Sequence, residues 1–88
     1  MENWSGKNLM KEYILRKCRN GDGSINSRET KRKGTLVFVH DVEIGKQLRF
    51  MYDEMAGVTT STVKSFTDAD GYLKVTTNNT YYEFEEVK

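Results

Sequence analysis

The 88-residue sequence predicts an α+β fold, in which an N-terminal helix is followed by a five-stranded antiparallel meander. Apolar residues near the start recur at the i, i+4 spacing of a helix face. From residue 35 onward, apolar and polar residues alternate with the two-residue period of a strand. Short turn sequences containing glycine or asparagine separate the alternating segments. A sheet this small is expected to curl into an SH3-like or OB-like barrel, and the alternative is an open sheet with the helix across one face.

Residues 1–23 are expected to form the helix and its cap. Glycine in Asn20-Gly21-Asp22-Gly23 can adopt the left-handed conformation that ends a helix. Residues 24–34 are polar, have no apolar period and end in Lys31-Arg32-Lys33, so this range is expected to be a basic linker. The apolar face of the helix is expected to comprise Leu9, Met10, Tyr13, Ile14 and Cys18.

Residues 35–88 are expected to form an antiparallel β-domain that folds as one unit with the preceding residues. Turns are expected at Gly45-Lys46, at Asp68-Ala69-Asp70-Gly71 and at Asn78-Asn79. The five expected strands are Leu36–Ile44, Leu48–Asp53, Thr59–Phe66, Tyr72–Thr77 and Thr80–Val87.

The net charge of +1 conceals an uneven distribution. Residues 1–34 contain nine Lys and Arg against four Asp and Glu, whereas residues 35–88 contain five against nine. Either the basic part packs on the acidic part, or a charged partner prefers one end of the molecule. The chain has one cysteine, no apolar run of the roughly 18 residues that a membrane span needs, and no signal-peptide core after Met1. These features predict a cytoplasmic protein without a disulfide. The sequence does not determine its oligomeric state.

Residues 18–29 resemble the calcium loop of EF-hand and dockerin proteins. Gly23 falls at the turn position of that loop and Ile25 at its apolar position. Cys18, however, occupies the position of the first aspartate, and a thiol offers no oxygen to a hard cation. The loop is therefore expected to be degenerate, and no metal or other cofactor is predicted. The remaining ligand positions are held by Asn20, Asp22, Ser24, Asn26 and Glu29.

His40 is the only histidine, and no pattern in the sequence provides it with a catalytic companion. Asp41 follows it directly, but neighbouring residues of a strand point to opposite faces. A general acid or base requires a reacting group or a carboxylate held beside it. The sequence also contains no phosphate-binding loop, dinucleotide fingerprint or zinc-ligand spacing. We therefore predict that the protein is not an enzyme.

A pattern spread over residues 45–84 is similar to small uncharacterised proteins of phages, prophages and other mobile elements. It comprises Gly-Lys-x-Leu-Arg-x-x-Tyr at 45–52, Thr-Thr-Ser-x-Val-x-Ser at 59–65, and Val-x-Thr-x-Asn-Thr-x-Tyr-x-Phe at 75–84. The resemblance implies an accessory protein that blocks or redirects a larger one, for example in anti-defence. It implies no site residues.

The leading functional hypothesis is therefore a non-catalytic protein-binding module, an inhibitor or adaptor. One alternative is a nucleic-acid-binding protein, because clustered cations beside aromatic residues on a small barrel are typical of that class. Another is a β-barrel that sequesters a small ligand. The partner-binding residues are expected to be Tyr52, Tyr72, Tyr81, Glu83 and Glu85. The nucleic-acid-binding residues would be Arg28, Lys31, Arg32 and Lys33, and the ligand pocket would include His40 and Tyr82.

Overall fold

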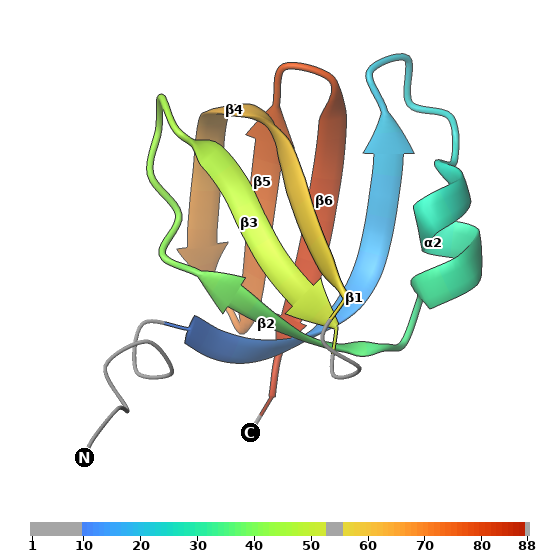
Figure 1. Cartoon of the computed structure of the whole chain (residues 1–88), viewed down its shortest axis with the longest axis vertical. Helices are drawn as coiled ribbons and strands as arrows, with labels where there is room; N and C mark the ends of the chain where they lie inside the picture. Colours follow the sequence, from blue (N-terminus) through green and yellow to red (C-terminus); the bar gives the residue numbers. More distant parts are fainter. Residues whose placement is uncertain (1–9, 53–55, 88) are drawn as a thin grey trace.

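The computed structural model describes residues 10–52 and 56–87, which form an antiparallel barrel (Figure 1). Six strands follow one another around the ring in chain order, and β1 pairs with both β2 and β6 to close it. A short helix, α2, connects β1 to β2. The elements are β1 (Met10–Asn20), α2 (Ser27–Arg32), β2 (Leu36–His40), β3 (Gln47–Tyr52), β4 (Gly57–Ala69), β5 (Tyr72–Thr77) and β6 (Thr80–Glu86).

The predicted α+β class was wrong, because residues 10–20 form a strand where a helix was expected. Tyr13 and Leu15 both point into the barrel, as strand alternation requires. The register against β6 then shifts between Leu15 and Lys17, which makes Arg16 the extra residue of a β-bulge. The next buried residue is consequently Cys18, three positions after Leu15. The bulge thus gives a strand an apolar spacing that resembles that of a helix.

The addition of β1 also changes the architecture of the sheet. The first half of β1 pairs with β2 and its second half with β6, so the strand closes the ring rather than lying across it. The structure is therefore neither one of the expected five-stranded barrels nor an open sheet covered by a helix. Among the described residues, no helix is long and apolar enough to cross a lipid bilayer.

The range 24–34, expected to be a basic linker, contains α2. The side chain of Asn26 caps this helix by accepting a hydrogen bond of 2.8 Å from the backbone N–H of Arg28. The side chain of Glu29 is buried against β1. Gly34 follows with a φ of +88°, a conformation that glycine adopts without strain, and leads the chain into β2.

Strand β4 is the longest strand and belongs to both sides of the barrel. Its first half pairs with β3, and its second half pairs with β5 after a register shift between Val63 and Ser65. Figure 1 shows the strand rising beside β3, bending sharply and descending beside β5. Asp70 and Gly71, both with positive φ, then form the tight turn into β5.

The centre of the barrel is filled by an aromatic cluster. The ring of Phe50 makes edge contacts with Tyr52, Tyr82 and Phe84, at centroid distances of 5.9, 5.6 and 5.2 Å. Tyr82 and Phe84 are stacked at 5.8 Å. Because all four side chains are buried, they form a packed core in the middle of the barrel.

Candidate functional site: an apolar groove beside strand β4

The second half of β4 has a strand neighbour on one side only. Its pairing with β3 ends at Thr62, and the backbone of Val63 still bonds to Gly45 and Lys46. From Lys64 to Ala69, the strand pairs with β5 and with no other described segment. We call residues 64–69 the β4 edge. Alternate backbone N–H and C=O groups of such an edge point away from its single neighbour, and they can pair with an added strand.

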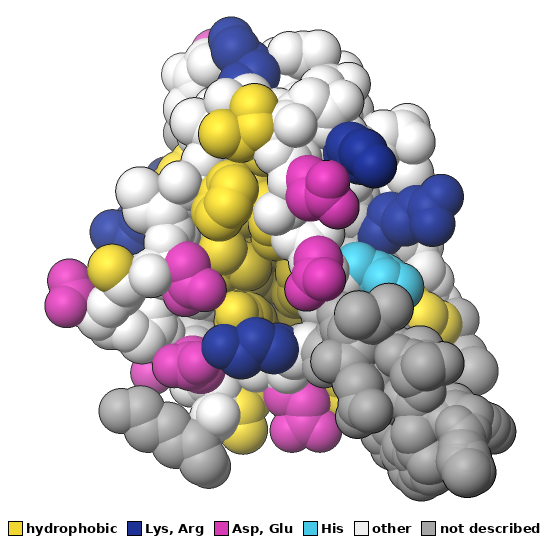
Figure 2. Space-filling view, turned by 90° about the vertical axis from the view of Figure 1, so that its left-hand side faces the viewer, with side chains coloured by type: hydrophobic (Ala, Val, Ile, Leu, Met, Phe, Trp, Pro, Cys, Tyr) yellow, Lys and Arg dark blue, Asp and Glu magenta, His cyan; other side chains and the backbone are white. Residues whose placement is uncertain are grey.

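A hollow of about 460 Å³ lies beside the β4 edge, and we call it the β4 groove. Its walls come from β1, β2, β4, β5 and the loop between β2 and β3. Figure 2 shows an apolar hollow on this face of the molecule, with acidic side chains on both sides of it. The apolar residues that line the β4 groove are Tyr13, Val39, Val42, Phe66 and Leu73.

Phe66 shows why this part of the barrel is open. It pairs with Val75, which is fully buried, and paired residues of a ladder point to the same side of the sheet. Phe66 therefore faces the interior, yet it is 36% exposed. In a closed part of the barrel the neighbouring strand would cover such a side chain. Beside the β4 edge, the described residues leave the ring exposed.

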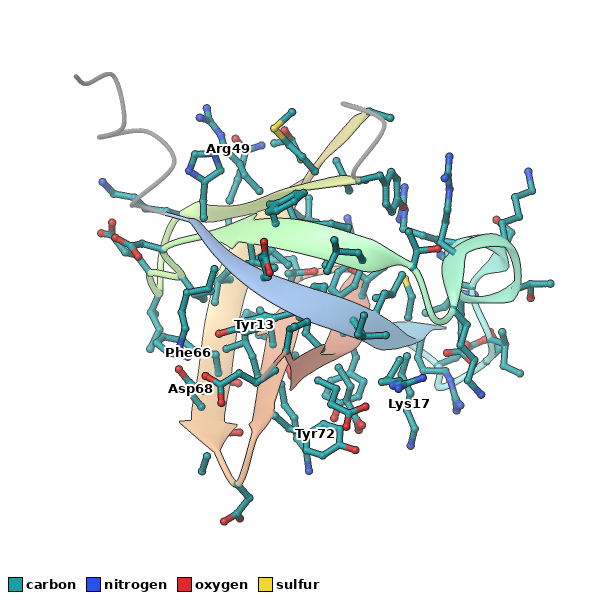
Figure 3. All side chains as sticks on the ribbon, turned by 90° about the horizontal axis from the view of Figure 1, so that it is seen from below. Tyr13, Lys17, Arg49, Phe66, Asp68 and Tyr72 are labelled. Atoms are coloured by element: carbon teal, nitrogen blue, oxygen red, sulfur yellow. The ribbon has the colours of Figure 1, made fainter. Side chains whose placement is uncertain are left out.

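Asp68 occupies the next inward-facing position of the β4 edge. It pairs with the buried Leu73, so its carboxylate points toward the β4 groove. Figure 3 shows Tyr13, Phe66 and Asp68 together on this side of the molecule, and all three line the groove. Within the described residues, the side chain of Asp68 forms no hydrogen bond or ion pair. Burial and the negative charge of Asp68 together raise the pKa of the Tyr13 phenol.

The charged residues around the β4 groove are mostly acidic. Asp41 and Glu43 line it from the loop between β2 and β3. The lysine among the described lining residues, Lys11, is paired with Glu86 at 2.9 Å, so its charge is already compensated. The groove therefore offers an apolar floor and a negative rim.

A second hollow of about 610 Å³ shares His40, Asp41 and Glu43 with the β4 groove and extends past Lys46 toward Arg49. Its lining is polar, and its cations balance its carboxylates. The imidazole ring of His40 forms no hydrogen bond within the described residues. That the protein is not an enzyme stays a prediction.

Four of the five residues predicted to bind a partner lie on the outer surface of β5 and β6. The Tyr81 hydroxyl donates a hydrogen bond of 2.6 Å to Glu83, and Glu85 accepts one of 2.7 Å from Arg16. Burial and the bond to Glu83 raise the pKa of Tyr81 to about 12. The ammonium nitrogen of Lys17 lies 3.7 Å from a carboxylate oxygen of Glu83. These side chains are thus paired with one another, mostly across the contact that closes the barrel.

The other two residues predicted to bind a partner are Tyr72 and Tyr52. Tyr72 begins β5 opposite Glu85 and is partly exposed. Tyr52 is only 5% exposed, and its ring lies 4.2 Å below the guanidinium group of Arg32. The structure therefore does not bring Tyr52 together with the residues of β5 and β6.

Three of the residues predicted to bind nucleic acid gather at the other end of the barrel. Arg28, Lys31 and Arg32 line a shallow hollow of about 300 Å³ together with Tyr52. Arg28 also donates a hydrogen bond of 3.3 Å to the Tyr82 hydroxyl. Lys33 caps the C-terminus of α2. Because Arg32 covers the Tyr52 ring, the face of that ring toward α2 is not available for stacking with a base.

The two residues predicted to line a ligand pocket are separated in the structure. His40 lines the β4 groove, but Tyr82 is 1% exposed and belongs to the central aromatic cluster. The pKa of the Tyr82 hydroxyl is raised, chiefly by burial. Tyr82 therefore supports the core, whereas His40 is accessible to a ligand.

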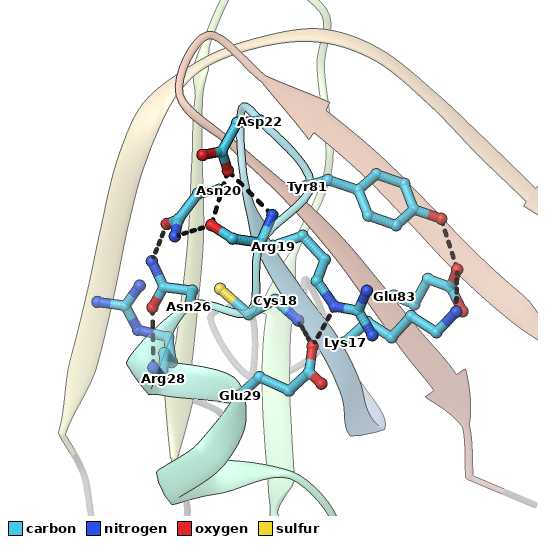
Figure 4. Close-up of polar contacts among 11 residues, drawn as sticks. Lys17, Cys18, Arg19, Asn20, Asp22, Asn26, Arg28, Glu29, Tyr81 and Glu83 are labelled. Carbon is cyan, nitrogen blue, oxygen red and sulfur yellow. Dashed lines mark hydrogen bonds and ion pairs between the residues drawn. The ribbon is translucent and has the colours of Figure 1, made fainter.

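The segment that resembles a calcium loop forms a network of internal hydrogen bonds (Figure 4). Asn26 donates to Asn20 at 2.8 Å, Asn20 donates to Ser24 at 2.9 Å, and Ser24 donates to Asp22 at 2.6 Å. At each of the five ligand positions, one oxygen atom accepts a hydrogen bond from the protein. Their observed role is to hold the turn between β1 and α2.

Glu29 fastens α2 to β1. One of its carboxylate oxygens accepts hydrogen bonds from the backbone N–H of Cys18 at 2.8 Å and from the Arg19 guanidinium group at 2.9 Å. The bond from Arg19 is the largest of the effects that hold the pKa of Glu29 below its usual value. Cys18 itself is fully buried, and this burial raises the pKa of its thiol.

Neither Phe66 nor Asp68 is predicted from the sequence as a site residue. Phe66 ends an expected strand, and Asp68 begins an expected turn. The available signal was the spacing Phe66-x-Asp68, which places both side chains on one face of a strand. The comparisons with known proteins add no candidate. No protein-family model, curated protein or solved structure gives a significant match to this chain.

Proposed function

We propose that the protein is a non-catalytic protein-binding module that takes up an extended segment of a partner protein along the β4 edge. The observation that carries this proposal is the coincidence of two features at residues 64–69. The backbone of these residues has a strand neighbour on one side only within the described chain, and the exposed ring of Phe66 lies directly beside it. An added strand would use both features at once.

The physical basis is β-strand addition. Backbone hydrogen bonds to the β4 edge would give affinity, and the side chains that enter the β4 groove would give specificity. An apolar side chain packed on Phe66, Val42 and Leu73 would remove apolar surface from water. The outer surface of β5 and β6 is less suitable, because its charged groups are already paired with one another.

The resemblance to small proteins of phages and mobile elements supports the type of partner. Small proteins of that origin often act by blocking or redirecting a larger protein, and an exposed strand edge can bind a segment of such a protein. We therefore propose an inhibitor or adaptor, with the cytoplasm as its compartment. Nucleic-acid binding through α2 is the competing proposal, and the experiment below separates the two.

We expect peptides selected from a random-sequence display library on the full chain to depend on Phe66. Phe66→Ala should weaken their binding about tenfold or more, because one large apolar contact contributes about 1.5–3 kcal/mol when fully formed. The dissociation constants can be measured by fluorescence anisotropy. Amide hydrogen exchange should also slow within residues 64–69 in the presence of a selected peptide, because an added strand protects the edge.

Ile25→Ala is the matched control, since Ile25 is an exposed apolar residue that does not line the β4 groove. It should leave peptide binding unchanged. Peptides that bound wild type and Phe66→Ala equally would refute the proposed site. Binding of an oligonucleotide that was lost when Lys31, Arg32 and Lys33 were all replaced by alanine, without any peptide binding, would support the nucleic-acid alternative instead.

A further inference from the structure

We infer that the segment bound in the β4 groove is a basic amphipathic strand, with an apolar side chain and a lysine or arginine two positions apart. This inference rests on the proposed function and specifies its ligand. Its evidence is the side-chain arrangement along the β4 edge and the charge of the groove.

The first argument is the geometry of the edge. Phe66 and Asp68 are two residues apart and both point into the β4 groove. In an added strand, the side chains that face the groove are also two residues apart, so their spacing matches that of Phe66 and Asp68. A partner residue packed against Phe66 therefore places its second neighbour beside Asp68.

The second argument is the charge of the groove. The carboxylate of Asp68 forms no hydrogen bond or ion pair within the described residues, so an added cation would be its counter-ion. Asp41, which also lines the groove, reinforces the negative potential there, whereas the charge of Glu43 is partly balanced by Lys46 at 3.8 Å. Lys11 interacts electrostatically with Asp68, but it is ion-paired with Glu86 at 2.9 Å and therefore offsets this potential only in part. An acidic segment would be repelled by the same groups, which gives selectivity between partners.

The experiment uses the full chain and three capped peptides in which valine and a variable residue stand two positions apart, with threonine between them, so that both side chains face the groove. The variable residue is lysine, glutamine or glutamate. We expect the lysine peptide to bind most tightly and the glutamate peptide most weakly. Asp68→Asn should weaken binding of the lysine peptide about fivefold, the magnitude expected for one partly exposed ion pair, and should leave the glutamine peptide unaffected. Asp68→Lys should reverse the order of the lysine and glutamate peptides.

Asp70→Asn is the matched control. It removes the same charge two residues away, in a turn position with a φ of 58° that asparagine tolerates, and Asp70 does not line the β4 groove. It should leave the preference for lysine unchanged. The ion pair should also weaken as salt is added, whereas the contact with Phe66 should not.

The possible failures of this inference and of the proposed function are distinguishable. Equal affinity for the three peptides, tighter binding of the glutamate peptide, or no binding of any of them would refute the basic ligand. The proposed function would still hold if library-selected peptides bound through Phe66. If the groove binds a second copy of this chain instead, sedimentation will show a dimer that Phe66→Ala dissociates, and that outcome also refutes a basic partner segment.

Discussion

Replacing Phe50 with alanine is expected to lower the free energy of unfolding by about 3–5 kcal/mol. The Phe50 ring contacts the rings of Tyr52, Tyr82 and Phe84 and is 1% exposed, so its removal leaves a cavity at the centre of the barrel. Domains of this size are stable by only about 5–15 kcal/mol, so the variant should lose a large part of its stability. Urea denaturation followed by circular dichroism measures the change.

Phe66→Ala provides the comparison within the same protein. Phe66 is 36% exposed on the β4 edge, so truncating it should cost about 1 kcal/mol or less and leave the slope of the urea transition unchanged. The two substitutions remove identical atoms, and only their surroundings differ. Similar losses for both variants would contradict the view that the central cluster, and not the groove, stabilises the barrel.

Much of the strand pattern was visible in the sequence. Tyr72–Thr77 is a strand with the bounds that alternation predicts, and the strands at Gln47–Tyr52 and Thr80–Glu86 lie within one or two residues of the expected ones. The first expected strand, Leu36–Ile44, ends already at His40, where the chain turns away toward the β4 groove. In these segments local alternation and tertiary burial agree, which is the condition for reading a strand from sequence.

The fold class could not be obtained in the same way, because β1 depends on contacts far along the chain. Residues 10–20 contain many good helix formers, and their two-residue alternation is interrupted at Arg16. The pairing of β1 with β2 and with β6, which sets Cys18 beside Tyr82 and Leu15 beside Phe84, decides the conformation. A preference of a few tenths of a kcal/mol per residue for helix is overridden by the burial of those side chains.

The candidate site was equally inaccessible to sequence reasoning, for a related reason. The sequence predicts His40 as a residue of a ligand pocket, which stays a prediction, and the structure places it at the β4 groove. Phe66 and Asp68 face the groove only because β4 bends after Thr62 and separates from β3. The groove is a property of five elements together, so no local pattern of the sequence contains it.

Replacing Glu29 with glutamine is expected to lower the free energy of unfolding by about 2 kcal/mol at pH 7. Its carboxylate is 7% exposed and accepts from Cys18 N–H and from Arg19, so the amide leaves a buried donor with a weaker partner and a cation without its counter-ion. Glu43→Gln is the matched control. The Glu43 side chain is 59% exposed, and its carboxylate oxygen lies 3.8 Å from the Lys46 ammonium nitrogen. Losing this exposed ion pair should lower the free energy of unfolding by about 0.5 kcal/mol or less.

The stabilisation from Glu29 should also depend on pH in one direction. Because Arg19 and the Cys18 N–H favour the charged form, the pKa of Glu29 in the folded protein lies below its unfolded value of about 4.5. Its contribution is therefore complete above the unfolded pKa and is lost as the pH falls through the folded pKa. The difference in urea midpoint between wild type and Glu29→Gln should be constant from pH 6 to 8 and shrink below about pH 4.5. A difference that grew toward acid would mean that the carboxylate is held protonated, and that α2 is fastened to β1 by other contacts.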